Sequence, residues 1–99
     1  MRLVIEAEVR DRIAKEAEWY RSRRPGLEDD LLQELGKAFE RIVHFPNASP
    51  VVHRRFRQYK LDRFPFHLIY YVAKEKILIV RMYHSVGDPK QKFRGLRRR

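Results

Sequence analysis

Two runs of strand-forming residues, separated by three residues, constrain the fold of this sequence more than any other feature. The first run spans 66–72 and the second spans 76–83. Both are rich in aromatic and β-branched residues, which suit a pleated and half-buried surface. Runs joined by so short a polar break predict a β-hairpin. Pro65 has no N–H to donate, so it should mark the first residue of a strand or a bulge. We expect the rest of the chain to pack around this hairpin.

Two helices should precede the hairpin. Apolar residues three and four positions apart define one helical stripe from about residue 7 to residue 24, and another from residue 28 to residue 44. The stripes consist of Val9, Ile13, Ala17 and Tyr20 in the first helix and of Leu31, Leu35, Ala38, Phe39 and Ile42 in the second. Pro25 and Gly26 break the pattern, and so short a link predicts an antiparallel helical hairpin.

Shorter strands are predicted over residues 2–6 and 52–61, which gives the order β-α-α-β-β-β. We expect an α+β fold in a single domain of residues 1–99, with an antiparallel sheet and the helical hairpin packed on one face. The pattern also allows a short C-terminal helix after Asp88. Trp19 should close the end of the core. The residues expected to be structural are Leu35, Phe39, Phe64 and Phe66.

Positive charge is concentrated in the second half of the chain. Residues 1–50 hold nine Lys or Arg against ten Asp or Glu, whereas residues 51–99 hold fourteen against three. A field confined to one half predicts an anionic partner, which is a nucleic acid, an acidic protein or a membrane surface. The basic residues after Pro89 have few apolar neighbours. We therefore expect them to add almost nothing to the core, and deletion of residues 95–99 to leave folding intact.

Composition excludes several classes of function. The chain has no cysteine, which excludes disulfides, thiolate zinc sites and cysteine nucleophiles and fits a cytoplasmic location. No apolar run approaches the roughly 20 residues of a membrane helix, and the first residues lack the apolar region of a signal peptide. The four histidines show no metal-ligand spacing. We expect no metal and no cofactor.

The alternation of residues 76–84 predicts which side chains share a face of the last strand. Ile77, Ile79, Arg81 and Tyr83 share one face, and Leu78, Val80, Met82 and His84 share the other. One sheet face should pack on the helices, while the other presents Arg, Lys, Tyr and His. Such a patch suits phosphate binding or the acid–base cleavage of RNA. In the alternative interpretation, the tyrosines are core or edge aromatics and His84 is a hydrogen-bonded histidine at a strand end.

Four segments occur along the chain in an order that is typical of one family. They are WYRSRRPGLEDDLLQEL, the Phe45-Pro46 pair, YKLDRFPFHLIYY shortly after Arg57, and YHSVGDPKQKFR. Together they resemble the ParE/RelE superfamily, the toxins of type II toxin–antitoxin modules, and the ParE branch most of all. The resemblance implies a compact α+β toxin that a co-encoded antitoxin holds inactive by wrapping an extended segment around it. ParE-like members are associated with poisoning of DNA gyrase, and RelE-like members with cleavage of mRNA in the ribosome.

The resemblance and the charge pattern indicate three sets of candidate site residues. For a nuclease, Arg57, Arg81 and His84 could fill catalytic roles, although the basic strand has no Glu to act as a general base. The candidates for target binding are Arg57, Lys90, Lys92, Arg94, Arg97, Arg98 and Arg99. The candidates for contact with an acidic, amphipathic antitoxin segment are Ile77, Ile79, Arg81 and Tyr83.

The favoured hypothesis is a toxin that binds and inhibits DNA gyrase without being an enzyme, and that forms a hetero-oligomer with an acidic antitoxin. The first alternative is a ribosome-dependent mRNA endonuclease, and the second is a non-toxic RNA-binding protein. A neighbouring reading frame for a small acidic protein would favour either toxin hypothesis over the third.

Overall fold

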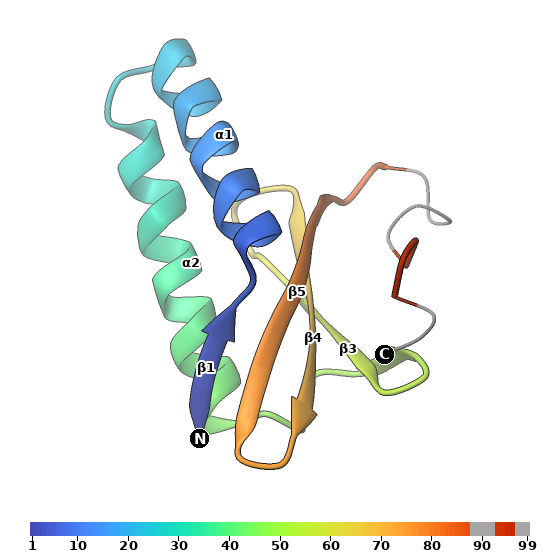
Figure 1. The fold of residues 1–99 in the computed structure, drawn as a ribbon. Helices are drawn as coiled ribbons and strands as arrows, with labels where there is room; N and C mark the ends of the chain where they lie inside the picture. Colours follow the sequence, from blue (N-terminus) through green and yellow to red (C-terminus); the bar gives the residue numbers. More distant parts are fainter. Residues whose placement is uncertain (88–92, 97–99) are drawn as a thin grey trace.

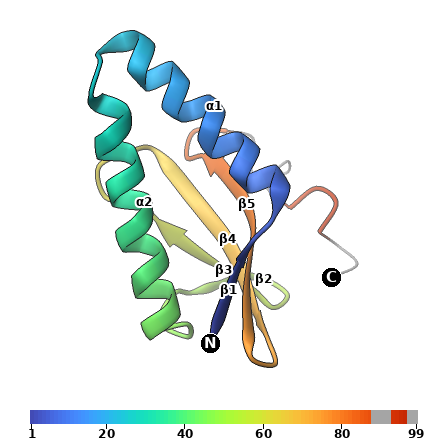
Figure 2. The same ribbon diagram turned by 60° about the vertical axis from the view of Figure 1, so that its left-hand side comes forward.

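The computed structural model describes residues 1–87 and 93–96 and confirms the predicted α+β class (Figure 1). Its elements are β1 (Arg2–Ile5), α1 (Ala7–Arg23), α2 (Leu27–His44), β2 (Val51–His53), β3 (Phe56–Lys60), β4 (Phe66–Ala73) and β5 (Lys76–His84). The five strands form one sheet in the order β1-β5-β4-β3-β2. The helical hairpin covers one face of this sheet (Figure 2).

The predicted β-hairpin lies at the centre of the sheet. β4 and β5 pair antiparallel along their whole length, and a two-residue turn joins them. Pro65 directly precedes β4, where its missing N–H costs no ladder hydrogen bond. Its carbonyl accepts a hydrogen bond of 2.8 Å from the N–H of Ser85. The hairpin is therefore held together at both ends.

One edge of the sheet departs from the predicted antiparallel pattern. β1 runs parallel to β5, with Leu3 opposite Ile77 and Ile5 opposite Ile79. A parallel pair needs a long crossover connection, and the elements from α1 to β4 provide it. The sheet is therefore mixed, with one parallel pair at this edge and antiparallel pairs elsewhere.

The strand predicted over residues 52–61 is in fact two strands, so the sheet has five strands rather than four. β2 and β3 pair antiparallel with His53 opposite Phe56, which leaves Arg54 and Arg55 as a two-residue turn. Arg54 has a φ of 52°, in the left-handed region that such turns use. Arginine is not among the residues that usually mark turns. The alternating pattern of residues 52–61 therefore gave no sign that the chain reverses its direction there.

The two helices form the predicted antiparallel hairpin and are separated where the sequence indicates. Gly26 in the link has a φ of 98°, which a residue with a side chain would adopt only with strain. The carboxylate of Glu28 accepts a hydrogen bond of 3.0 Å from the N–H of Gly26. Acidic residues fill the first turn of α2, where the helix dipole favours negative charge.

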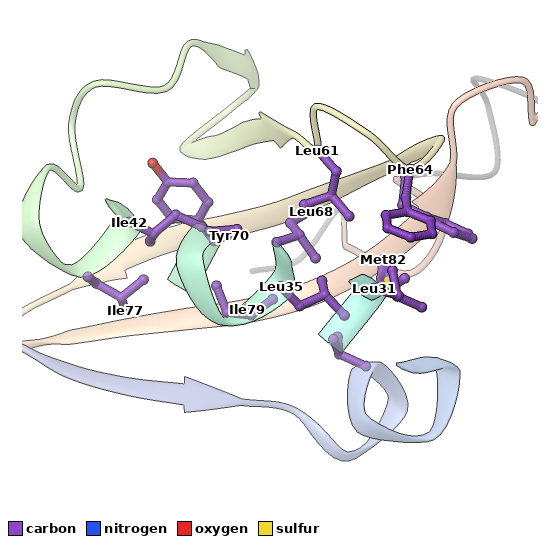
Figure 3. Close-up of a cluster of buried hydrophobic side chains, with 13 residues drawn as sticks. Leu31, Leu35, Ile42, Leu61, Phe64, Leu68, Tyr70, Ile77, Ile79 and Met82 are labelled. Carbon is purple, nitrogen blue, oxygen red and sulfur yellow. The ribbon is translucent and has the colours of Figure 1, made fainter. Parts of the chain in front are cut away.

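The main core lies between the helical hairpin and the sheet (Figure 3). The central strands contribute Tyr70, whose ring is completely buried. Its hydroxyl donates a hydrogen bond of 2.8 Å to the carbonyl of Pro46, which ties the loop after α2 to the core. Of the residues predicted to be structural, Leu35, Phe64 and Phe66 are buried in this core. Phe39 is partly buried and packs at its margin.

Trp19 does not close the core as expected. Its side chain is 49% exposed, and the guanidinium carbon of Arg23 lies 4.6 Å from the centre of its ring. Tyr20 takes the inward position instead, with its ring 5.0 Å from that of Phe64. One step along a helix rotates a side chain by about 100°, so only one of these two neighbours can face the core.

A smaller apolar cluster covers the sheet face opposite the helices. It consists of Phe56, Ile69, Tyr71, Val80 and Leu96. Leu96 is only 2% exposed, which contradicts the expectation that the last residues add nothing to the core, because deletion of residues 95–99 removes this buried side chain. The short helix predicted after Asp88 begins outside the described residues, and residues 93–95 form a turn.

We expect Phe66→Ala to lower the free energy of unfolding by about 3–5 kcal/mol, because removal of a buried ring leaves a cavity. The ring packs edge-on against Tyr20 and His84. Urea denaturation measures this loss. Phe45→Ala is the matched control, since Phe45 is 66% exposed and its truncation should change stability by no more than about 0.5 kcal/mol. Equal effects of the two changes would contradict the assigned core.

Leu96→Ala should lower the free energy of unfolding by about 2–5 kcal/mol, the cost of truncating a buried leucine. Thermal denaturation provides the measurement, with Val86→Ala as the control because Val86 is 83% exposed. A Leu96→Ala protein as stable as the wild type would show that this segment does not cover the sheet in solution.

Candidate functional site

A β-bulge in β5 decides which side chains reach the sheet face opposite the helices, here called the second face. The pairing of β4 with β5 shifts between Ile69 and Tyr70, which leaves Val80 as an additional residue on β5. Beyond the bulge the alternation moves by one position. Arg81 and Tyr83 therefore lie on the second face, whereas the predicted alternation grouped them with the isoleucines that pack against the helices.

A chain of three hydrogen-bonded side chains crosses the second face. The Tyr83 hydroxyl donates to Oε1 of Gln58, and Nδ1 of His67 lies 2.8 Å from the same hydroxyl. Because an amide carbonyl can only accept, the hydroxyl proton points toward Gln58. Nδ1 of His67 must then carry a proton and donate it to the oxygen of Tyr83. The network thus selects the tautomer of His67 that has its lone pair on Nε2.

Burial also keeps the hydroxyl of Tyr83 protonated. It raises the pKa of the Tyr83 hydroxyl to about 12, so the hydroxyl remains a donor at neutral pH. The pKa of Tyr20, on the opposite side of the sheet, is raised as well, first by burial and then by the negative charge of Glu16. At neutral pH the direction of the hydrogen bonds from His67 to Gln58 is therefore constant.

Two cations belong to the same face as this network. Lys60 is the cross-strand partner of His67. Arg81 lies 3.4 Å from the carboxylate of Glu8 and donates a hydrogen bond of 2.8 Å to the carbonyl of Arg94. An imidazole with a defined tautomer beside cations can bind a phosphate group or transfer a proton.

The structure does not bring the three predicted catalytic residues together. Arg57 donates to two backbone carbonyls of the loop between α2 and β2, at 3.1 and 2.7 Å, so it holds that loop in place. The ring of His84 packs edge-on against Phe66 at 5.4 Å, at the margin of the main core. Of the three, Arg81 lies on the second face.

The residues predicted to bind partners are accessible only in part. Ile77 and Ile79 have no exposed surface, because both pack beneath the helices, and this contradicts the premise that they present a surface to an antitoxin. Arg81 and Tyr83 are half-buried on the second face, and Arg94 is exposed. The remaining target-binding candidates lie outside the described residues; these are Lys90, Lys92, Arg97, Arg98 and Arg99.

Within residues 1–87 and 93–96, no group of three His, Asp or Glu side chains is placed to hold a metal ion. The same part of the chain contains no helix that is both long enough and apolar enough to cross a membrane.

The sequence interpretation missed Gln58 and His67 as site residues. Both lie in segments predicted as strands, but their importance depends on which residues of β3 and β4 stand opposite each other. The short link of residues 61–65 contains that signal, because a tight connection places Lys60 beside His67 and so sets the register of the remaining pairs. The bulge that brings Tyr83 to this face has no comparable signal.

The fold and the second face define a small α+β protein with a helical hairpin on one side of its sheet and a basic, tyrosine-containing network on the other. No protein-family model matches the chain, and a search of curated proteins found no match either. Among solved structures, a chain of "Chromosomal ParDE TA system from P. aeruginosa" is similar, with a TM-score of 0.74 and 19% identity, covering 85% of this chain and 95% of that chain. At this identity the similarity shows the fold alone, and it agrees with the predicted α+β architecture of a helical hairpin on one face of a sheet.

We expect Tyr83→Phe to remove part of the loss of stability at alkaline pH. The folded protein holds this proton more tightly than the unfolded chain, because the pKa rises from 10.0 to about 12. The resulting stability is fully present below about pH 10 and is lost as the pH rises through about 12. Urea midpoints of the wild type and the variant across this range measure the difference.

At neutral pH, Tyr83→Phe should cost about 1–3 kcal/mol, because Gln58 and His67 lose their shared hydrogen-bond partner. Tyr59→Phe, on the helix side of the sheet, serves as the control for removal of a hydroxyl. Parallel stability curves for wild type and Tyr83→Phe between about pH 10 and 12 would contradict the assignment.

Proposed function

We propose that this protein is the toxin of a type II toxin–antitoxin module. The fold carries the proposal, since the similarity to a chain of a ParDE toxin–antitoxin structure extends over 95% of that chain. The sequence motifs of the helical hairpin and of β4 give independent support. So does the excess of positive charge in residues 51–99, which suits a protein that an acidic partner neutralises.

We infer that the toxin acts in the cytoplasm by binding DNA gyrase rather than by cleaving RNA. The position of the predicted nuclease residues supports this choice, because Arg57 holds a loop and His84 packs at the margin of the main core, while Arg81 lies on the second face. Inhibition by binding needs no such assembled set, and it can rest on a broad basic surface.

A cognate acidic antitoxin should hold the toxin inactive. Because Ile77 and Ile79 are buried, the apolar anchors for that partner must come from elsewhere. The helical hairpin offers Trp19 and Leu32, which are 49% and 45% exposed. Charge complementarity would then speed association, and these anchors would slow dissociation.

The test compares two activities of the purified protein, inhibition of supercoiling by gyrase and cleavage of ribosome-bound mRNA. We expect the wild type to inhibit gyrase and to leave mRNA intact. Removal of residues 97–99, which spares the buried Leu96, should weaken inhibition gradually and in a salt-dependent way. His67→Gln and His84→Ala should reduce inhibition only as far as they reduce stability.

Cleaved mRNA together with unaffected gyrase would replace this proposal by the endonuclease. In that case His67→Gln or His84→Ala should lower the rate of cleavage by about 10²–10⁴-fold, the usual effect of losing a proton-transferring group. A protein that neither slows growth when expressed nor acts in either assay would favour the non-toxic RNA-binding alternative.

A further inference from the structure

One end of the sheet brings together two tight turns and the start of β1 (Figures 1 and 2). The β2–β3 turn and the β4–β5 turn both lie at this end. The backbone N–H of Arg2 donates to the carbonyl of Glu75 at 3.0 Å, which joins β1 to the second turn. The guanidinium carbon of Arg55 lies 4.1 Å from the centre of the Tyr71 ring, which brings the first turn against the last residues of β4.

The exposed side chains of the two turns and of the residues that begin β1 and β5 are mostly cationic. These cations, here called the turn patch, are Arg2, Arg54, Arg55, Lys74 and Lys76. Glu75 and Met1 are the other residues of these turns and strand starts. In the part of the chain that the structure describes, no cation of the turn patch forms an ion pair, whereas Arg12, Arg63 and Arg81 each meet a carboxylate. The charge of the turn patch is therefore not neutralised within the described fold.

The backbone of both turns gives a second, independent indication. Arg54 and Lys74 have φ values of 52° and 54°, in the left-handed region that glycine and asparagine adopt at lower cost. In each turn a cationic residue therefore occupies a position whose backbone conformation favours glycine or asparagine. Residues with a strained backbone are often found at functional sites, so this conformation points to a function for the two side chains.

The composition of the turn patch identifies the kind of partner. Protein interfaces have an apolar and aromatic centre with few charges, but within the two turns and at the starts of β1 and β5 the one exposed large apolar side chain is Met1. Binding to a nucleic acid backbone, in contrast, rests on cations that displace counterions from phosphates. We propose that the turn patch binds the phosphate backbone of a nucleic acid without reading base sequence. This proposal goes beyond the toxin function and does not depend on its target.

The test measures binding of the full chain to fluorescently labelled DNA, both duplex and single-stranded, by anisotropy over a range of KCl concentrations. The informative variant is Arg54→Asn combined with Lys74→Asn, because asparagine fits the left-handed backbone. We expect its Tm to equal or exceed that of the wild type. Each lost phosphate contact reduces the magnitude of the negative slope of log K against log salt by about 0.9 on duplex DNA, and it weakens binding about fivefold near physiological salt. The double variant should therefore bind the duplex about 25-fold more weakly.

A matched pair of substitutions separates the turn patch from the net charge of the protein. Lys15→Gln combined with Lys37→Gln removes the same charge from exposed positions on α1 and α2. This control should retain most of the affinity and the slope of the wild type.

Three results would overturn the proposal. The first is wild-type protein that binds neither form of DNA, and the second is an equal loss of affinity in the two double variants, which would indicate net charge alone. The third is binding of polyglutamate as tight as that of DNA, with the same dependence on Arg54 and Lys74, which would assign the turn patch to an acidic protein.

Discussion

The need to cover both faces of the central strands is the constraint on which the rest of the structure depends. Residues on both faces of β4 are buried, including Leu68 and Tyr70 on one side and Ile69 and Tyr71 on the other. A strand that is apolar on both faces requires a layer on each. The helical hairpin forms the first layer, and the segment that contains Leu96 contributes to the second. The stability of the sheet therefore depends on elements from both ends of the chain.

The bulge in β5 allows polar side chains of a largely apolar strand to lie on the second face. Without the additional residue, the alternation would send Arg81 and Tyr83 toward the helices, where burial of an arginine among apolar side chains would be costly. With it, Met82 enters the main core and Tyr83 meets Gln58 and His67 on the second face. Bulges often re-aim side chains in this way near functional sites. One additional residue in β5 thus allows the apolar side chains to pack in the main core and the polar side chains to form the network on the second face.

Local patterns allowed the helices and the central hairpin to be predicted, because periodicity, Pro25-Gly26 and Pro65 act over a few residues. The turn at Arg54 was missed because arginine carries no turn preference and its left-handed backbone is imposed by the pairing of β2 with β3. Leu96 and the network of His67 could not be predicted for a different reason. Their environment is made by residues far away in the sequence, and strand register decides which of these meet. The core was therefore easier to predict than the candidate site.

The parallel pair of β1 with β5 has a consequence for how the chain is synthesised. β1 leaves the ribosome first, but the strand that must receive it is the last one of the sheet to be made. Contacts between segments so distant in sequence form late, since closure of a long loop is entropically unfavourable. The nascent chain therefore carries an unpaired first strand until most of the sheet has emerged. A surface that needs the completed sheet therefore forms only after β5 has been synthesised.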